Sequence, residues 1–192
     1  MIDWHSVFRG ARIFHCSGIT CAVSQSAADA TFEAVRIAKE MGLTICCDIN
    51  YRKNLWKYGA DAHDVLSQLM QYSDFIFGDQ GEYDITTNIP RVQFKPVETD
   101  ARIDEAAYMD FFGKVQALYP NCKKFILAIR NQIGSTHHTL TGLLYTKGRL
   151  VQTRIYDIPS VVDPMGVGDA FVAAYVHACL KWPDDNQRCL DF

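Results

Sequence analysis

Short apolar runs alternate along the chain with longer segments whose apolar positions recur at helical spacing. The apolar runs have the length expected of strands buried on both faces, and they lie at residues 11–18, 43–49, 74–78 and 124–130. The helical segments begin at capping residues or end at glycine or proline, and they lie at residues 24–41, 61–71, 104–118 and 169–180. Residues 140–145 and 150–158 predict two paired strands around a Lys-Gly turn, and residues 86–104 predict a loop.

This alternation predicts one α/β domain over residues 1–192, a three-layer arrangement with a mostly parallel sheet and helices on both faces. Ligands of such sheets bind beyond the carboxyl ends of the strands. The segments to search for function therefore begin at Ser17, Asn50, Gly78, Arg130 and Asp163.

The composition and charge of the chain limit the partners and the cellular location that we expect for it. The chain has 192 residues, of which 48% are hydrophobic and 21% charged, and its formal net charge is -3. Because it has no basic run and no apolar stretch of membrane-spanning length, we expect neither nucleic acid nor membrane as a partner. Its first residues lack the apolar core of a signal peptide, so we expect a cytoplasmic protein.

Seven cysteines are present, an odd number, and their spacing matches no zinc-ligand pattern. We expect reduced thiols, the alternative being a redox-sensitive pair. Cys46 and Cys47 are adjacent in a strand-like run, so their side chains should point to opposite faces of the sheet.

The most informative segment is the stretch DPMGVGDAF, which starts at Asp163. Gly166 and Gly168 precede a predicted helix, and glycine lets the backbone approach a ligand closely. The free N–H groups of a first helical turn attract an anion. Asp169 at this position is either a plain helix cap or a base that removes a proton from an attacking hydroxyl.

This segment resembles the signature D-[TS]-x-G-A-G-D-x-F of the ribokinase (pfkB) family of carbohydrate kinases. Pro164 and Val167 depart from it, and the matching residues are Asp163, Gly166, Gly168, Asp169 and Phe171. The resemblance implies that Asp169 is the catalytic base and that the backbone amides of Gly166, Val167 and Gly168 form an anion hole. It also implies a nucleotide-binding role for Asp163.

Two earlier segments resemble the 2-keto-3-deoxygluconate kinases of that family. One runs from Asp48 through Asn50 and Arg52 to Trp56, and the other is SGIT at residues 17–20. The resemblance implies that the substrate is bound by Arg52, Asn50, Gly18 and Ile19. Arg52 can donate two parallel hydrogen bonds to a carboxylate or phosphate, although a surface arginine and ordinary turns are the alternatives.

A third segment, with Asp79 and Glu82, resembles the N-x-x-E motif that organises magnesium in the family, with aspartate in place of asparagine. The resemblance implies a metal role for both carboxylates, while a helix cap is the alternative for Asp79. Arg130 follows a strand at a place where relatives contact the nucleotide.

Together these resemblances imply ATP and Mg²⁺ as cofactors and phosphorylation of a primary hydroxyl of a small sugar acid, first of all 2-keto-3-deoxygluconate. A neutral-sugar kinase of fructokinase or ribokinase type, or a catalytically silent binding protein, is the alternative. Family members are longer, so we expect the fold to be incomplete, without the lid that covers the sugar. Self-association is left open.

Overall fold

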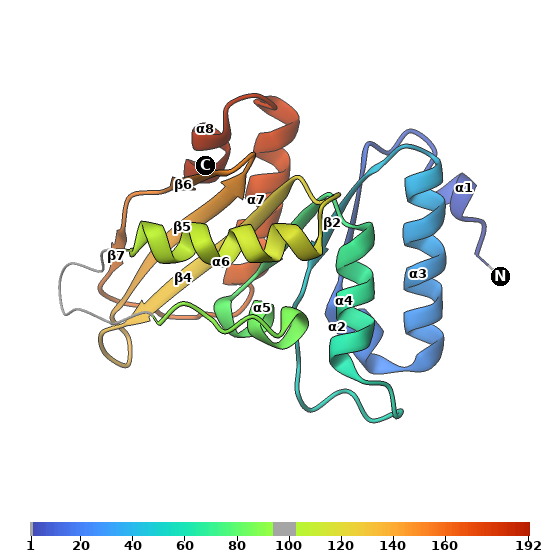
Figure 1. Cartoon of the computed structure of the whole chain (residues 1–192), viewed down its shortest axis with the longest axis horizontal. Coiled ribbons are helices and arrows are strands. Elements are labelled where there is room, and N and C mark those ends of the chain that lie inside the picture. Colours follow the sequence, from blue (N-terminus) through green and yellow to red (C-terminus); the bar gives the residue numbers. More distant parts are fainter. Residues whose placement is uncertain (1, 94–102) are drawn as a thin grey trace.

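The computed structural model describes residues 2–93 and 103–192 (Figure 1). The strands are β1 (Ile13–Ser17), β2 (Thr44–Asp48), β3 (Phe75–Gly78), β4 (Lys124–Gln132), β5 (His138–Thr146), β6 (Arg149–Gln152) and β7 (Tyr156–Ile158). The helices are α1 (Trp4–Val7), α2 (Gly18–Val23), α3 (Gln25–Glu40), α4 (Ala62–Tyr72), α5 (Gln80–Thr87), α6 (Glu105–Leu118), α7 (Val167–Lys181) and α8 (Asn186–Asp191).

All seven strands form one sheet in the order β1-β2-β3-β4-β5-β6, with β7 also paired to β5. The pairs among β1, β2, β3 and β4 are parallel, and the pairs that β5 makes with β4, β6 and β7 are antiparallel. The predicted α/β class is confirmed, and the parallel part of the sheet ends at β4.

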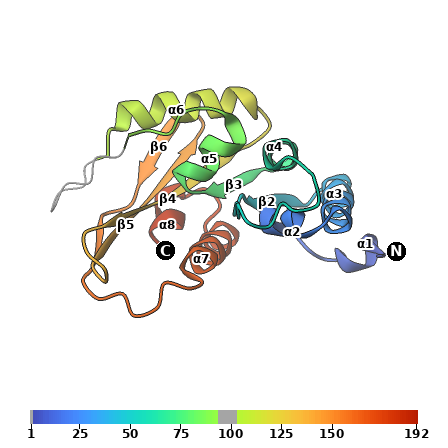
Figure 2. The ribbon, with the colours of Figure 1, turned by 90° about the horizontal axis from the view of Figure 1, so that it is seen from below.

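Helices cover both faces of the sheet, as predicted. Helices α3, α4 and α6 pack on one face, and α7 and α8 pack on the other (Figure 2). Within β2, Cys47 belongs to the core beneath α3, whereas Cys46 belongs to the core beneath α7. The prediction of opposite faces for these two cysteines is therefore confirmed.

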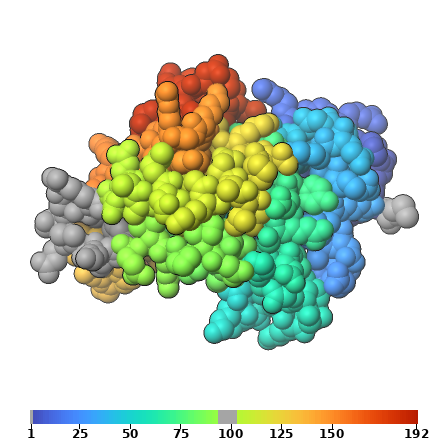
Figure 3. Space-filling view, in the orientation of Figure 1, coloured from blue at the N-terminus to red at the C-terminus, as the bar shows by residue number. Residues whose placement is uncertain are grey.

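The larger core lies beneath α6, which runs across the face seen in Figure 3. It is strongly aromatic: Phe112 stacks on Tyr145 with ring centroids 5.6 Å apart and meets Tyr83 edge to face at 5.8 Å. Both Phe112 and Tyr83 are fully buried. Burying each such side chain contributes on the order of 2 kcal/mol, so this core fixes the sheet beneath the helix.

The structure departs from the sequence prediction in several places. Residues 150–158 form two strands, β6 and β7, which pair with different parts of β5. Residue 18, predicted to be in a turn, begins the short helix α2, and α7 begins at Val167, two residues before its predicted start. Helices α1 and α8 are additional, because four and six residues are too short for a helical period to be visible.

The predicted loop at residues 86–104 can be compared only in part. Helix α5 extends to Thr87, residues 88–93 have no regular structure, and residues 94–102 lie outside the described residues. Among residues 2–93 and 103–192, no helix is long and apolar enough to cross a membrane.

Candidate active site

The register of the parallel strands places the predicted site segments along one edge of the sheet. Ser17 of β1 is opposite Asp48 of β2, and Asp48 is opposite Phe77 of β3. Gly78, the next residue, is opposite Leu127 of β4. The chain segments after β1, β2 and β3 therefore start side by side, as the sequence predicted for a parallel sheet.

Helix α7 begins near this edge with an unusual N-terminus. Gly166 is its N-cap residue in the left-handed conformation, at φ 76°, and no side chain caps the helix. Aspartate or serine side chains cap α1, α3, α4, α5, α6 and α8, whereas α2, like α7, has no side-chain cap. The first backbone N–H groups of α7 are thus left for another acceptor.

The loop before α7 owes its shape to its own residues. Asp163 accepts a hydrogen bond at 2.8 Å from the backbone N–H of Met165, which forms a tight turn ahead of Gly166. Glycine at position 166 follows from its positive φ. At Gly168, by contrast, an added Cβ would meet nothing within 4 Å. The fold of this chain does not demand glycine there, whereas close approach of a ligand would.

Asp169, in the first turn of α7, lies close enough to Asp48 for its negative charge to change the pKa of Asp48. Burial and the negative charge of Asp169 raise the pKa of Asp48 to about 6. Partial burial lowers the pKa of His15, and Asp169 opposes that shift. His15 and Ser17 alternate with Cys16 along β1, so they share one face of the strand. Sequence reasoning missed Asp48 and His15 as site residues.

Glu82 joins the segments that follow β2 and β3. Its carboxylate accepts hydrogen bonds at 2.9 Å from the backbone N–H of Tyr51 and at 2.9 Å from that of Asp79. Asp79 in turn accepts from the N–H of Glu82 at 2.8 Å, which completes a capping box at the start of α5. Asp79 is thus a helix cap, which the sequence analysis gave as the alternative to a metal role.

Burial and the nearby charge of Asp79 raise the pKa of Glu82 to about 7. Asp48 adds to this effect, so three carboxyl groups repel one another near the site. A cation placed among them would relieve that repulsion. Because backbone N–H groups already occupy both oxygens of Glu82, the residues fit Mg²⁺ held through water and phosphate better than an all-protein cage.

Arg52 and Asn50 follow β2 on the same edge. The Arg52 guanidinium is about half exposed and donates to the carbonyl oxygen of Tyr51 at 3.0 Å, with a carboxylate oxygen of Glu82 at 3.8 Å. Asn50 has φ 43°, and its side-chain oxygen is buried with no hydrogen-bond partner among the described residues. A polar residue in a strained conformation with an unused acceptor is typical of a ligand site.

Gly18 has a packing role. A Cβ added there would come within 2.1 Å of the Ile49 carbonyl oxygen and 2.4 Å of a Leu66 methyl carbon, so only glycine fits. Gly18 is buried at the start of α2, and Ile19 beside it is half-buried. Contact of these two residues with a sugar stays a prediction. Arg130 is exposed on β4, three residues beyond Leu127, so its nucleotide contact also stays a prediction.

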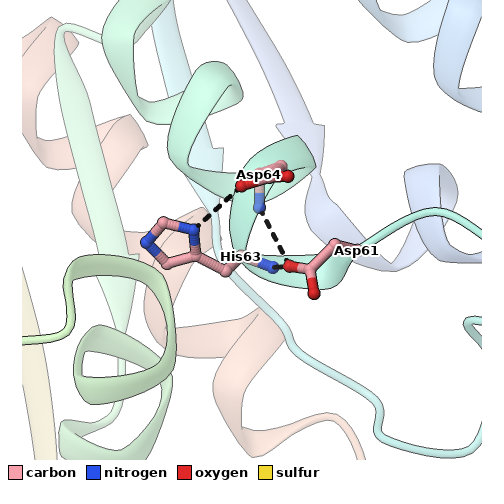
Figure 4. A group of neighbouring side chains, drawn as sticks. All are labelled: Asp61, His63 and Asp64. Carbon is pink, nitrogen blue, oxygen red and sulfur yellow. Dashed lines mark hydrogen bonds and ion pairs between the residues drawn. The ribbon is translucent and has the colours of Figure 1, made fainter.

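One group of potential metal ligands lies elsewhere among the described residues. Asp61, His63 and Asp64, at the start of α4, have ligand atoms within 4.8 Å of one another (Figure 4). Asp61 caps the helix by accepting from the backbone N–H of His63 and Asp64. The ring of His63 contacts Asp64 at 3.2 Å and Asn88 at 2.9 Å. Capping accounts for the group without a metal.

The known proteins that this chain resembles are carbohydrate kinases. The chain is 26% identical over 178 residues to a 5-dehydro-2-deoxygluconokinase from Clostridium perfringens, covering 92% of this chain and 45% of that protein. It matches the crystal structure of a 2-dehydro-3-deoxygluconokinase from Thermotoga maritima with a TM-score of 0.83 at 26% identity, covering 98% of this chain and 54% of that one. It matches a PfkB family carbohydrate kinase from Listeria grayi with a TM-score of 0.82 at 29% identity, over 98% and 54% of the two chains. No family model matches the sequence.

More distant structures share the fold alone. A fructokinase from Xylella fastidiosa with bound ATP has a TM-score of 0.62 at 22% identity, over 98% of this chain and 50% of its own. Another neighbour, from E. coli, was solved in complex with ATP and Mg²⁺, at TM-score 0.63 and 22% identity, over 98% and 51% of the two chains. The chain spans about half the length of the relatives it matches. Over almost its whole length it has the ribokinase-like fold and is similar in sequence to sugar kinases of the PfkB family.

Proposed function

We propose that this chain phosphorylates the primary hydroxyl of a small sugar acid with ATP, and that 2-keto-3-deoxygluconate is the first substrate to test. The observation that carries the proposal is the start of α7: an N-terminus without a side-chain cap, with Asp169 in its first turn close enough to Asp48 to raise the pKa of that carboxyl group. The similarity to kinases named for keto-deoxy sugar acids supports the substrate class.

The chemistry follows from these groups. The sugar hydroxyl attacks the terminal phosphorus of ATP, a new O–P bond forms, and the bond to ADP breaks. Asp169 takes the proton that the hydroxyl loses. The backbone N–H groups of Gly166, Val167, Gly168 and Asp169 would face the transferring phosphoryl group and stabilise its negative charge, helped by the helix dipole. Positioning and charge of this kind account for most of the catalysis of phosphoryl transfer.

The remaining residues would bind and orient. Arg52 would hold the substrate carboxylate or a phosphate oxygen through its planar guanidinium. Asn50 would direct its unused acceptor toward a sugar hydroxyl, and Arg130 and Asp163 would lie beside the nucleotide. Magnesium, when bound, neutralises charge on the phosphates, and Asp79 and Glu82 would hold it through water.

The test is ADP release by this chain with ATP, Mg²⁺ and a panel of 2-keto-3-deoxygluconate, gluconate, fructose and ribose. We expect turnover on the keto-deoxy acid and a loss of at least ~100-fold in Asp169→Asn, as for a general base. The matched control is Asp110→Asn on α6, where an exposed carboxylate pairs with Lys114, and it should retain the parent rate. A folded chain that releases no ADP with any sugar, or an Asp169→Asn variant with parent activity, would contradict the proposal.

A further inference from the structure

Two thiols meet where α7 and α8 pack on the sheet. Cys179 of α7 and Cys189 of α8 belong to the same buried core and are 8% and 1% exposed. Burial, and after it the neighbouring Cys179, raises the pKa of Cys189 to about 11. The Cys189 thiol donates a hydrogen bond to the Trp182 carbonyl oxygen at 3.1 Å. Cys189 is thus a neutral thiol beside Cys179.

A lysine adjoins Cys179. The amine of Lys124, at the start of β4, donates to the Cys179 sulfur at 3.5 Å. The same amine lies 5.0 Å from the ring centroid of Phe75 and 5.5 Å from that of Tyr175. Among residues 2–93 and 103–192, no carboxylate oxygen is within ion-pair distance of it. Cys179 is therefore a thiol that a positively charged lysine amine contacts directly.

Cys179 also lines an open cavity of about 570 Å³, together with Lys124, Lys123 and Cys122. The first residues of β2, β3 and β4 contribute to its wall, so it lies at the opposite edge of the sheet from the candidate active site. The cavity is large enough to admit a small oxidant. Cys179 therefore combines a neighbouring cation, a second thiol and a route from solvent.

The other cysteines lack this combination. Cys16 and Cys47 are opposite each other on β1 and β2 and also interact, which raises the pKa of Cys47, but neither lines the cavity or receives a hydrogen bond from a lysine. Cys122 lines the cavity, yet its thiol donates to the carbonyl oxygens of Asp74 and Lys124, and burial raises its pKa to about 12. These thiols serve as internal controls.

We propose that Cys179 is an oxidation site that forms a disulfide with Cys189. In the first step the Cys179 thiolate attacks hydrogen peroxide, the O–O bond breaks, and a sulfenic acid and hydroxide form. In the second step the Cys189 sulfur attacks the sulfenic sulfur, and the disulfide forms with loss of water. The sulfurs lose two electrons overall, and the peroxide gains them.

The test treats the reduced full chain with hydrogen peroxide, blocks the remaining thiols and maps the peptides by mass spectrometry. We expect a species lacking two hydrogens in which the Cys179 and Cys189 peptides are joined. Cys189→Ser should instead leave a sulfenic acid on Cys179 that a dimedone-type reagent traps. A disulfide between other cysteines, or oxidation of Cys16 or Cys122 as fast as Cys179, would overturn the proposal.

Two lysine variants test the origin of the reactivity. Lys124→Met keeps the apolar stem over Phe75 and Tyr175 but removes the charge, and it should slow oxidation of Cys179 by about tenfold. Lys123→Met is the matched control, because that lysine lines the same cavity but pairs with Asp74 at 3.0 Å, so the rate should not change. Equal rates in Lys124→Met and the parent would refute activation by Lys124.

Discussion

Glu82 accepts a hydrogen bond at 2.9 Å from the backbone N–H of Tyr51, thirty-one residues earlier in the chain. This bond ties the start of α5 to the segment that carries Asn50 and Arg52. Since the second oxygen of Glu82 accepts a hydrogen bond from the N–H of Asp79, one partly buried carboxylate orients two loops of the candidate active site. A single side chain therefore links the two loops directly.

Titration of Asp48 should report the position of Asp169. The negative charge of Asp169 is, after burial, the largest cause of the raised pKa of Asp48, and Asp79 contributes less. Asp169→Asn should therefore lower the pKa of Asp48 from about 6, as measured by carbon-13 NMR of its carboxyl group, and Asp79→Asn should lower it less. The opposite ranking would show that Asp169 points away from β2.

Stability should fall as the pH rises through the weakly acidic range. The pKa values of Asp48 and Glu82 are raised to about 6 and about 7 in the folded chain from 3.8 and 4.5, so between these limits the folded state binds more protons than the unfolded state. Stability from these protons is present below pH ~4 and is lost by pH ~7, on the order of 2 kcal/mol for each group. Urea unfolding at a series of pH values measures it.

Asp48→Asn is the variant for this experiment, because it removes one of the two titrations. Its decline in unfolding free energy between pH ~4 and pH ~6 should be smaller than that of the parent by roughly 2 kcal/mol. A parallel decline in both proteins would mean that Asp48 is ionised at its ordinary pKa in the folded state.

Two glycines of the loop before α7 should respond oppositely to alanine. Gly166→Ala forces a side chain into a left-handed conformation and should destabilise the chain by about 1–2 kcal/mol. Gly168→Ala adds a methyl group in open space within a helix and should stabilise it by up to about 1 kcal/mol. Thermal unfolding compares the two.

Substitution of Gly168 by alanine should change activity and stability in opposite directions. If phosphate approaches the backbone there, Gly168→Ala lowers ADP release even though the fold gains stability. A Gly168→Ala protein that is both more stable and fully active would remove the reason given for close ligand approach at this residue.

Gly18→Ala should be severely destabilising. The added Cβ would overlap the Ile49 carbonyl oxygen and a Leu66 methyl carbon, and the carbonyl cannot move without disturbing the end of β2. A loss of several kcal/mol is expected, beyond the usual cost of overpacking. Gly113→Ala on α6 is the matched control, since a Cβ there meets nothing within 4 Å and alanine favours helix. Chemical denaturation of both variants distinguishes the steric overlap at position 18 from a general intolerance of alanine in place of glycine.

Arg52 should distinguish the two candidate substrate classes. Because its guanidinium is half exposed and faces solvent near Glu82, Arg52→Ala should leave the fold intact. If Arg52 binds a substrate carboxylate, kcat/KM falls more for 2-keto-3-deoxygluconate than for fructose, by about 10- to 100-fold for a lost charged hydrogen bond. Equal losses on both sugars would favour a phosphate contact and a neutral-sugar kinase.

The strands and main helices could be predicted because the sheet is covered on both faces, so its strands appear as apolar runs such as residues 43–49. The site was only partly predictable. Asp48 was named as the start of a segment but was given no role, because its importance depends on the face of β2 on which α7 packs, which the sequence does not reveal. Likewise, the need for glycine at position 18 comes from Ile49 and Leu66, which are distant in sequence. Local signals gave the capping role of Asp79, but not the hydrogen bond that the Tyr51 backbone N–H donates to Glu82.

The pairing of β7 with the first residues of β5 limits the movement of the segment that leads to Gly166. Ile158, the last residue of β7, is opposite His138, and Val161 donates its N–H to the Thr136 carbonyl oxygen at 2.7 Å. The turn between β4 and β5 therefore anchors one end of the segment that leads to Gly166, and α7 anchors the other. The segment is thus fixed at both ends, so lengthening the turn at residues 133–137 would loosen the loop before α7 without altering any residue within that loop.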